Sequence, residues 1–591
     1  MSSRAVFRTS ILIVALMFLV ATTTHATIIT NDTAHLADGR FDYIIVGAGL
    51  TGITVANKLS AANHSVLLIE AGPDPSWNPA VYNAEERGDL NGYCNWRYPA
   101  YNESGVRLDW EIDSGKCVGG GTSINGMVWY RPTEIEVNKL QDLGNPGWNW
   151  AALEPYMQAI EKFHPPDETQ SQQGAGYDPD VHGYVGVVNV SFPTPMRIPK
   201  AQVIYKQALP IVFPGLTVGN DLSNRSSIVS ASSSWTIWYD PVSGNNRRSS
   251  AADALLSAPD QKRASFVVLT DHKVDKVVLN SSLRATGVTF ASSPTGETST
   301  AYVSREVILA AGSLGTPPIL ERSGIGRGDI LERAGVSQLV DLPGVGANLN
   351  DQPGTGTSAL VRKDLWNDTG LIDGRNLFAP EISLVNVDEL WAAVNAGSAA
   401  TLEGAQRVLN TSIDLILNSR LPVGEFVAES YPTILFAAFW PSMPLSWGHI
   451  HINASDPFSD PIITPRLLTD SFDQAVGVAL AKRSRDLFSS MPFAEVVQDS
   501  YYDPHIGVNG TDEEYLAWYK STTFGASHWI GSTAMMKREW GGVVDAKLRV
   551  YGVRGLRVVD AGTLPFQITS HPMAMLYAIA QRAADIIMGN I

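Results

Sequence analysis

The sequence contains very little cysteine: Cys94 and Cys117 are the only two among 591 residues. Such a chain is not held together by a disulfide framework, because those scaffolds are small and rich in cysteine. No spacing of cysteine and histidine resembles a zinc site, so we predict no bound metal. Stability must therefore come mainly from a buried apolar core.

Positive charge is also scarce. Lysine and arginine number 43 against 59 acidic residues, which gives a formal net charge of −16. Nucleic acids and anionic membranes bind basic surfaces, so this charge argues against both as partners. An apolar content of 44% with 17% charged residues is typical of a globular protein. The length predicts two interlocked domains.

Only one long apolar run stands at the start of the chain, Ile11–Ala21. Two arginines precede it and small residues ending at Ala26 offer a cleavage point, which predicts a secretory signal over residues 1–26. The run is too short to span a bilayer comfortably, which disfavours the alternative, a membrane anchor. Arg582 and Asp585 interrupt the apolar C-terminal stretch. We therefore expect no stable membrane insertion.

Sequons of the form N-x-S/T recur along the chain and fit a glycosylated, exported protein. Their asparagines are Asn31, Asn63, Asn102, Asn189, Asn224, Asn280, Asn367, Asn410, Asn453 and Asn509. We predict a soluble, secreted, N-glycosylated protein. The oligomeric state has no signal in the sequence.

A dinucleotide-binding pattern follows the N-terminal region. The apolar run 43–46 predicts a buried parallel strand, and Gly47, Gly49 and Gly52 follow in G-x-G-x-x-G order before a helical pattern. A second strand ends at Glu70, which can accept hydrogen bonds from ribose hydroxyls. Strand, turn, helix, strand and acid in this order predict a dinucleotide on the helix N-terminus.

Two further glycine-rich segments favour a flavin over an exchangeable nicotinamide. Residues 114–132 ("SGKCVGGGTSINGMVWYRP") offer backbone N–H groups to a large anionic cofactor. Residues 307–326 predict a strand, a glycine turn and a helix with Pro317 and Pro318 in its first turn. Several chain segments would then surround one extended cofactor.

With these motifs the chain resembles the glucose–methanol–choline oxidoreductase family of FAD enzymes. Both signature stretches of that family are matched in full, at 115–132 and 312–326, and "LPGVGANLNDQP" (342–353) and the C-terminal segment from Gly541 also match. The resemblance covers roughly residues 40 to 588. It implies a discontinuous α/β FAD-binding domain of the Rossmann-like ββα type. It also implies an α+β substrate domain built on an antiparallel sheet.

The expected domain boundaries alternate along the chain. The FAD-binding domain takes residues 38–190, 245–353 and 524–591, the last part with the catalytic histidines. The substrate domain takes 191–244, including Trp235–Tyr239, and 354–523.

The resemblance also implies the residues that contact FAD. Carried over position by position they are Gly47, Gly49, Leu50, Thr51, Gly52, Glu70, Gly119, Thr122, Asn125, Gly126, Val274, Asp560 and Ala561. Cys117 departs from the family, whose members usually have a small residue there. It could pair with Cys94, remain a buried thiol, or link covalently to the flavin.

Two histidines match the catalytic pair of the family, His528 and His571. Alcohol oxidation needs a base for the hydroxyl proton while a hydride leaves the carbon for flavin N5. Neutral imidazole suits the base because its pKa lies near working pH, and a second imidazole can stabilise developing alkoxide charge. We assign His528 as the principal base and His571 as its partner, an order that could be reversed.

The substrate expected from the sequence is an apolar alcohol. Sugar-oxidising relatives have Arg and Asn where this chain has Phe524 and Ala526, and Trp440 is a further candidate for the pocket. Losing those polar partners leaves sugar hydroxyls unpaired at about 1–3 kcal/mol each. We therefore predict an aryl or allylic primary alcohol, or an alcohol of fungal secondary metabolism such as the ascladiol that patulin synthase oxidises.

Three alternatives stay open at this point. The chain could be a glucose-type sugar oxidase or dehydrogenase, or a redox-silent lyase or cyclase with structural FAD. A binding protein without activity is less favoured, since it would have little use for both histidines. The electron acceptor could be O2 or another molecule.

Overall fold

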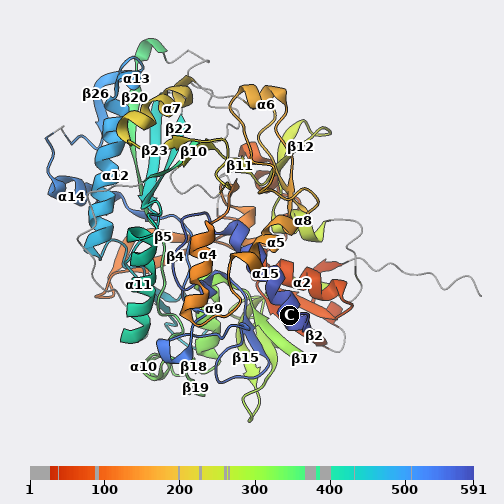
Figure 1. Cartoon of the computed structure of the whole chain (residues 1–591). Helices are drawn as coiled ribbons and strands as arrows, with labels where there is room; N and C mark the ends of the chain where they lie inside the picture. Colours follow the sequence, from red (N-terminus) through yellow and green to blue (C-terminus); the bar gives the residue numbers. More distant parts are fainter. Residues whose placement is uncertain are drawn as a thin grey trace, which may run out of the picture.

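In the computed structural model of the chain, two large sheets organise the molecule (Figure 1). The structure describes residues 27–591 except 37–38, 87–91, 197–199, 225–228, 258–262, 264–265, 366–380, 386–400, 431–432 and 507–508. The predicted signal segment 1–26 and the sequon at Asn367 lie outside the described residues. Across the described part of the chain, no helix is long and apolar enough to cross a membrane.

The first sheet is mixed, with a parallel centre. Its strands run in the order β1-β14-β3-β2-β17-β16-β15, and β28 pairs with β17. Their bounds are β1 Ile28–Thr30, β2 Arg40–Val46, β3 Val66–Ile69, β14 Phe266–Leu269, β15 Lys273–Leu279, β16 Ala285–Ala291, β17 Ser299–Leu309 and β28 Leu556–Val558. β3 and β14 are buried along their whole length, as expected of strands covered on both faces.

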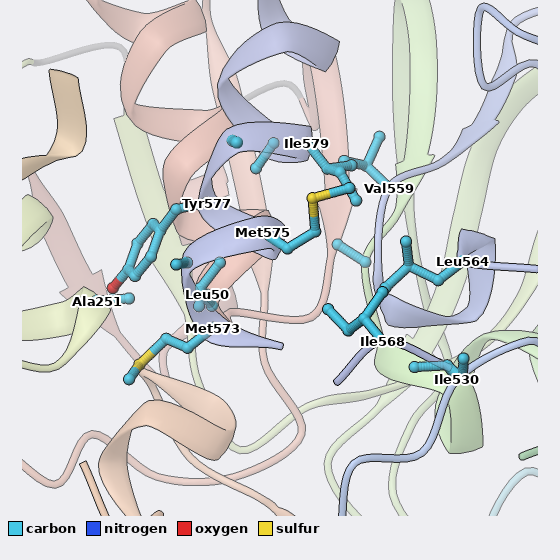
Figure 2. Close-up of a cluster of buried hydrophobic side chains, with 14 of the residues drawn as sticks. Leu50, Ala251, Ile530, Val559, Leu564, Ile568, Met573, Met575, Tyr577 and Ile579 are labelled. Atoms are coloured by element: carbon cyan, nitrogen blue, oxygen red, sulfur yellow. The ribbon is translucent and has the colours of Figure 1, made fainter. Parts of the chain in front are cut away.

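Helices α2 (Leu50–Ala61) and α15 (Met573–Met588) pack on each other beside this sheet. Figure 2 shows Met575 and Ile579 of α15 near Val559, and Met573 and Tyr577 on the side of Leu50 and Ala251. Met575 and Tyr577 are fully buried. The last helix of the chain therefore closes the core around the first glycine turn.

The second sheet is mostly antiparallel, in the order β26-β20-β23-β22-β21-β10-β9, with β27 beside β20. Its strands are β9 Thr217–Val218, β10 Val229–Ser232, β20 Pro353–Val361, β21 Glu381–Val385, β22 Gly424–Ser430, β23 Ile434–Pro441, β26 Val497–Asp503 and β27 Phe524–Gly525. Helices α12 (Ser471–Ser489) and α7 (Lys200–Val212) contact β23 and β22 respectively. Figure 1 shows this sheet and its helices on the opposite side of the molecule from α2.

Smaller sheets and further helices connect the two large sheets. The short strands are β4 Asn95–Tyr101, β5 Arg107–Gly115, β6 Val128–Trp129, β7 Glu161–Phe163, β8 Val188–Val190, β11 Ser234–Trp235, β12 Ile237–Asp240, β13 Asn245–Arg248, β18 Ile325–Gly326, β19 Val340–Asp341, β24 His449–His451 and β25 Ile462–Thr464. The remaining helices are α3 Pro79–Tyr82, α4 Glu134–Lys139, α5 Trp150–Ile160, α6 Glu168–Gln172, α8 Ala251–Leu256, α9 Gly312–Arg322, α10 Gly328–Arg333, α11 Leu402–Leu417, α13 Met491–Ala494 and α14 Asp512–Thr522.

The chain passes back and forth between the two sheets, and the predicted α/β and antiparallel parts are both present. The stretch Trp235–Tyr239, which we expected on the substrate side, lies in small sheets. Trp235 pairs with Val128 on β6, and β12 forms a hairpin with β13. The strand of the large antiparallel sheet that directly precedes this stretch is β10, which pairs with β21.

Helix α9 corrects one expectation. It begins at Gly312, so Pro317 and Pro318 lie inside the helix and not in its first turn. Pro317 has no N–H to donate to the carbonyl of Ser313, four residues earlier. The Ser532 hydroxyl donates to that carbonyl at 2.6 Å. A side chain from a distant segment thus satisfies the acceptor that proline leaves open, which local sequence rules do not reveal.

Candidate active site

A long cavity of about 980 Å³ runs between the glycine-rich segments and the second sheet. It extends from the ends of the first-sheet strands to the two histidines named above. The predicted cofactor and pocket residues that line it are Gly47, Gly49, Leu50, Thr51, Glu70, Thr122, Asn125, Gly126, Val274, Trp440, Ala526, His528, Asp560, Ala561 and His571. Residues from at least six separate segments are thereby brought to one space.

The first glycine turn has no room for side chains on its protein side. Gly47 has a φ of 99°, and an added Cβ there would lie 2.5 Å from the Ala310 carbonyl oxygen. A Cβ on Gly52 would lie 1.9 Å from the Gly47 oxygen. Gly52 does not line the cavity and serves the close packing of helix on strand. A Cβ on Gly49 meets only the Gly120 Cα, at 4.0 Å, and would otherwise project into the cavity.

The second glycine segment meets the first at this point. Gly119 does not line the cavity, but it has a left-handed φ of 99° and turns the chain so that Gly120, Gly121 and Thr122 do. A side chain on Gly119 would meet the Ser123 hydroxyl at 2.1 Å. Glycine is therefore needed at two kinds of position: where the two glycine-rich segments pack against each other, and where the backbone forms the wall of the cavity.

Cys94 and Cys117 form a disulfide beside this loop, with their Cα atoms 5.1 Å apart and both side chains fully buried. Of the three alternatives for Cys117, the structure therefore has the pairing, and neither a free thiol nor a thiol available to a flavin. The Lys116 N–H donates to the Cys94 carbonyl at 2.7 Å. The bridge fixes the loop that lines the middle of the cavity.

Glu70 lies at one end of the cavity, at the end of β3. Its carboxylate accepts from the Ala48 N–H at 2.8 Å and from the Gly72 N–H at 2.9 Å. Burial raises the pKa of Glu70 to about 7, against the lowering effect of these backbone donors. Its remaining lone pairs face the cavity, as an acceptor for ribose hydroxyls would need.

Asp560 joins the start of α9 to the C-terminal segment. Its carboxylate accepts from the Gly312 N–H at 3.1 Å and the Thr316 hydroxyl at 2.6 Å, and from the Gly562 N–H at 2.9 Å. Burial raises its pKa to about 6. These bonds hold the Asp560–Ala561 backbone against the cavity.

His528 and His571 lie together at the opposite end, with ring centroids 4.6 Å apart. Burial lowers the pKa of His528 well below its usual value, and the neighbouring His571 acts in the same direction. His528 is therefore neutral at physiological pH. A neutral imidazole has one nitrogen that can accept a proton.

The hydrogen bonds of His528 indicate which nitrogen that is. Its Nδ1 lies 2.7 Å from Gln352 Oε1. The Gln352 amide nitrogen donates to the Ser442 carbonyl at 2.7 Å, which fixes Oε1 toward the histidine. Because Oε1 only accepts, Nδ1 carries the proton and Nε2 is the acceptor.

The turn that carries His528 is held by a buried carboxylate. Asp351 accepts from the Ser527 N–H at 3.0 Å and from the His528 N–H at 2.8 Å. Ser527 has a left-handed φ of 63°, which is uncommon for serine. Burial raises the pKa of Asp351 to about 7. The carboxylate thus stabilises a strained turn whose geometry aims the histidine.

His571 is held by Glu425, a fully buried residue of β22. The His571 Nε2 donates to Glu425 Oε1 at 2.9 Å, and the Trp440 indole N–H donates to Glu425 Oε2 at 3.1 Å. The Trp440 ring lies 6.0 Å from the His571 ring and 6.3 Å from the His528 ring. Tyr130 packs on His571 from another side, with ring centroids 5.4 Å apart. Glu425 thus fixes the orientation of both the His571 ring and the Trp440 ring.

Sequence reasoning missed four of these residues. Asp351 and Gln352 lie in the motif "LNDQP", which could have drawn attention to them. Tyr130 lies in the glycine-rich segment 114–132, which could have drawn attention to it as well. Glu425 had no such signal, because its partners come from segments far away along the chain. A glutamate in the middle of a strand becomes informative only when the strand is placed beside His571.

Phe524 does not line the cavity. Its side chain is 42% exposed, on the short strand β27 beside Gly354. Ala526 does line the cavity, and its N–H donates to the Gln352 carbonyl at 3.0 Å. The structure therefore brings Ala526 and Trp440 to the pocket and leaves Phe524 on the outside.

The residues present fit a flavin dinucleotide. The cavity of about 980 Å³ is lined by segments from the end of β3 to the two histidines, by Gly49 at the N-terminus of α2 and by the buried acceptor carboxylate of Glu70. Each feature is one that a pyrophosphate or ribose needs. The opposite end, at the histidines, is then left for the flavin ring and the substrate.

Family models for GMC oxidoreductases match the chain twice, over residues 41–354 and over residues 444–580. A glucose oxidase-like protein, fsoC, of Humicola fuscoatra is 33% identical over 573 residues, which cover 93% of this chain and 95% of that protein. A dehydrogenase, xptC, of Emericella nidulans is 30% identical and covers 96% and 95% of the two chains.

Solved structures are similar as well. An FAD-dependent oxidoreductase from Chaetomium thermophilum has a TM-score of 0.80 at 27% identity, over 93% of this chain and 99% of that one. A fungal aryl-alcohol oxidase has a TM-score of 0.76 at 24% identity, over 93% and 99%. The second likeness concerns the fold alone.

Proposed function

The chain belongs to the GMC oxidoreductase family and is an FAD-dependent enzyme acting on CH–OH groups, and from this premise we propose that its substrate is an aryl or allylic primary alcohol. Alcohols of fungal secondary metabolism fall in this class. The observation that carries the proposal is the chemistry of the pocket beside the two histidines.

That pocket offers few hydrogen-bonding side chains. Near the histidines the cavity is lined by the apolar side chains of Trp440, Ala526, Pro572 and Met573. The polar side chains there are those of Ser527 and of Asn125, whose amide already contacts the Met573 sulfur at 3.6 Å. A hydrophobic alcohol loses little on entering such a site, whereas a sugar gives up water at each hydroxyl without replacement. This asymmetry favours an alcohol with one reacting hydroxyl on an apolar body.

The proposed chemistry uses the two histidines in different ways. When bound, FAD supplies the hydride acceptor at flavin N5. His528 Nε2 takes the hydroxyl proton as general base, because the Gln352 contact keeps the proton on Nδ1. His571, held by Glu425, stabilises negative charge on the alcohol oxygen. Trp440 lines the pocket beside both rings.

A sugar donor is the second candidate, and the relatives favour it. The names of several similar proteins contain "glucose oxidase". A panel of alcohols compared with glucose by kcat/KM separates the candidates. Preference for glucose by more than about tenfold, ~1.4 kcal/mol in transition-state binding, would overturn our proposal.

The electron acceptor is tested in the same panel. We propose O2 or a second small acceptor, and peroxide formation followed beside dye reduction identifies which. Turnover that yields peroxide at the rate of alcohol loss indicates an oxidase. Dye reduction without peroxide indicates a dehydrogenase.

We further infer that the protein is exported and N-glycosylated. The buried disulfide fits an oxidising compartment, and Asn31, Asn102 and Asn453 are exposed. The sequon at Asn189 is a poor acceptor, because Asn189 Oδ1 is hydrogen-bonded to His164 at 2.9 Å and Ser191 is buried. A mass shift on glycosidase treatment of the secreted protein, absent from peptides with Asn189, checks this.

A further inference from the structure

At the Glu70 end of the cavity lies a lysine whose ammonium has no hydrogen-bonding partner in the part of the chain that the structure describes. Lys273 is the first residue of β15, directly before Val274, and both line the cavity. Its ammonium lies 4.9 Å from the Trp96 ring centre and 5.6 Å from the Phe458 ring centre. Among the described residues it makes no hydrogen bond and no ion pair. Two aromatic faces are its close partners.

This arrangement leaves the Lys273 ammonium available to a ligand, since its side chain is half-buried and lines the cavity. An ammonium has three N–H donors and no acceptor, and π faces satisfy them only weakly. Burial, with the charge of Arg322 nearby, lowers the pKa of Lys273 to about 8. A group with lone pairs placed in the cavity would remove the mismatch.

The surroundings carry further positive charge. Lys116 places its ammonium 4.3 Å from the same Trp96 ring, and Arg322 also lines the cavity. Arg322 is neutralised in part by Asp275, whose carboxylate lies 3.2 Å away. The two lysines have no such carboxylate in contact within the described chain. The charges of Asp460 and Asp456 oppose this field at Lys273, although the effect of Arg322 is larger than that of either. The positive groups therefore still favour a ligand with electron-rich atoms at this end.

We propose that Lys273 binds the adenine-nucleotide half of FAD, with Trp96 and Phe458 holding its ammonium toward that part of the cavity. The adenine nitrogens, ribose oxygens and phosphate oxygens are all acceptors suited to an ammonium. Lys273 would add a side-chain contact next to Val274, which the sequence already places among the FAD-contacting residues. The inference is independent of the alcohol substrate, because its readout is flavin binding.

The test measures ligand affinity in the full-length protein after removal of its flavin. FAD, FMN, AMP and adenosine are titrated into wild type, Lys273→Met and Lys276→Met. Lys276 is a matched control, since it is an exposed lysine of the same strand. We expect Lys273→Met to bind FAD and AMP about tenfold more weakly, with FMN unchanged and Lys276→Met equal to wild type. Weaker adenosine binding places the contact on base or ribose, and weaker AMP binding alone places it on phosphate.

A second measurement does not depend on a folded variant. Amine-reactive labelling of the wild-type protein is read by mass spectrometry with and without FAD. FAD should protect Lys273 and leave Lys276 labelled. Equal labelling of Lys273 in both states would overturn the proposal. So would unchanged AMP affinity in Lys273→Met, or an equal loss of AMP and FMN binding together with a lower melting temperature.

Discussion

Glu425 orients two rings of the pocket, those of His571 and Trp440. It is fully buried, yet its two oxygens accept from His571 and Trp440. A buried carboxylate with such donors remains stable only while they stay in place. We therefore expect the Glu425 carboxylate to contribute both to the proposed oxidation and to the stability of the fold.

We expect Glu425→Gln to slow flavin reduction by alcohol about tenfold or more while flavin stays bound. The amide keeps the size of the side chain but replaces a charged acceptor of the His571 and Trp440 hydrogen bonds, and such charged hydrogen bonds contribute about 1.5–3 kcal/mol. The measurement is the anaerobic reduction rate against pH. Glu403→Gln, at an exposed ion pair of α11, is the control. An unchanged rate of flavin reduction would show that Glu425 has no role in the oxidation.

For individual residues, the sequence predicts the place of some side chains in the site but not of others. Gly47, Gly49 and Glu70 could be found because a dinucleotide imposes a local pattern on adjacent residues. Phe524 could not be placed, since its orientation depends on the pairing of β27 with Gly354, far away along the chain. Side chains in one local motif are predictable, and contacts made across the fold are not.

Among the elements, the strand–turn–helix unit at β2 and α2 separates two kinds of glycine. Gly52 is enclosed by the Gly47 carbonyl, whereas Gly49 faces the cavity. One supports the packing of the helix, and the other leaves room for a ligand.

Substitutions at these two positions should therefore fail differently. Gly49→Val should give a folded protein with little flavin, because its side chain projects into the space for the pyrophosphate. Gly52→Ala should lower the stability of the flavin-free protein itself, because its Cβ meets a backbone oxygen at 1.9 Å. Flavin absorbance per protein and the melting temperature of the stripped protein are measured. Yellow, fully active Gly49→Val would contradict the assignment.

Helix α9 shows why element boundaries were harder to predict. Two adjacent prolines usually mark a helix start, yet here Ser532 replaces the missing donor inside the helix. The existence of the helix followed from its local pattern. Its start depended on a hydroxyl more than two hundred residues away.

On the scale of the whole molecule, buried acids link stability to pH. Burial raises the pKa of Asp473 to about 7 and of Asp351 to about 7, and two acidic partners raise the pKa of His182 to about 9 against the effect of its burial. In the unfolded chain these groups titrate near 3.9 and 6.5. The folded protein therefore holds protons that the unfolded chain has lost at neutral pH.

It follows that the free energy of unfolding should fall between about pH 6.5 and about pH 8. Raised folded pKa values stabilise below the unfolded pKa, and that contribution is lost as pH rises through the folded value. His449 and His528, whose pKa values are lowered, are neutral in both states across most of this window. Urea unfolding at both pH values measures whether the free energy of unfolding falls. Asp473→Asn should make the difference between the two pH values smaller. An equal or greater free energy of unfolding at the higher pH would contradict this prediction.

The most direct test of the account is anaerobic flavin bleaching by a benzylic alcohol, followed in wild type and in His528→Ala. The account predicts that the wild-type flavin is reduced, and that His528→Ala keeps its flavin but is reduced about 10²–10⁴ times more slowly, the usual cost of a lost general base. A wild-type flavin that stays oxidised with every alcohol would identify a redox-silent enzyme. Near-normal bleaching in His528→Ala would contradict the role of His528 as base.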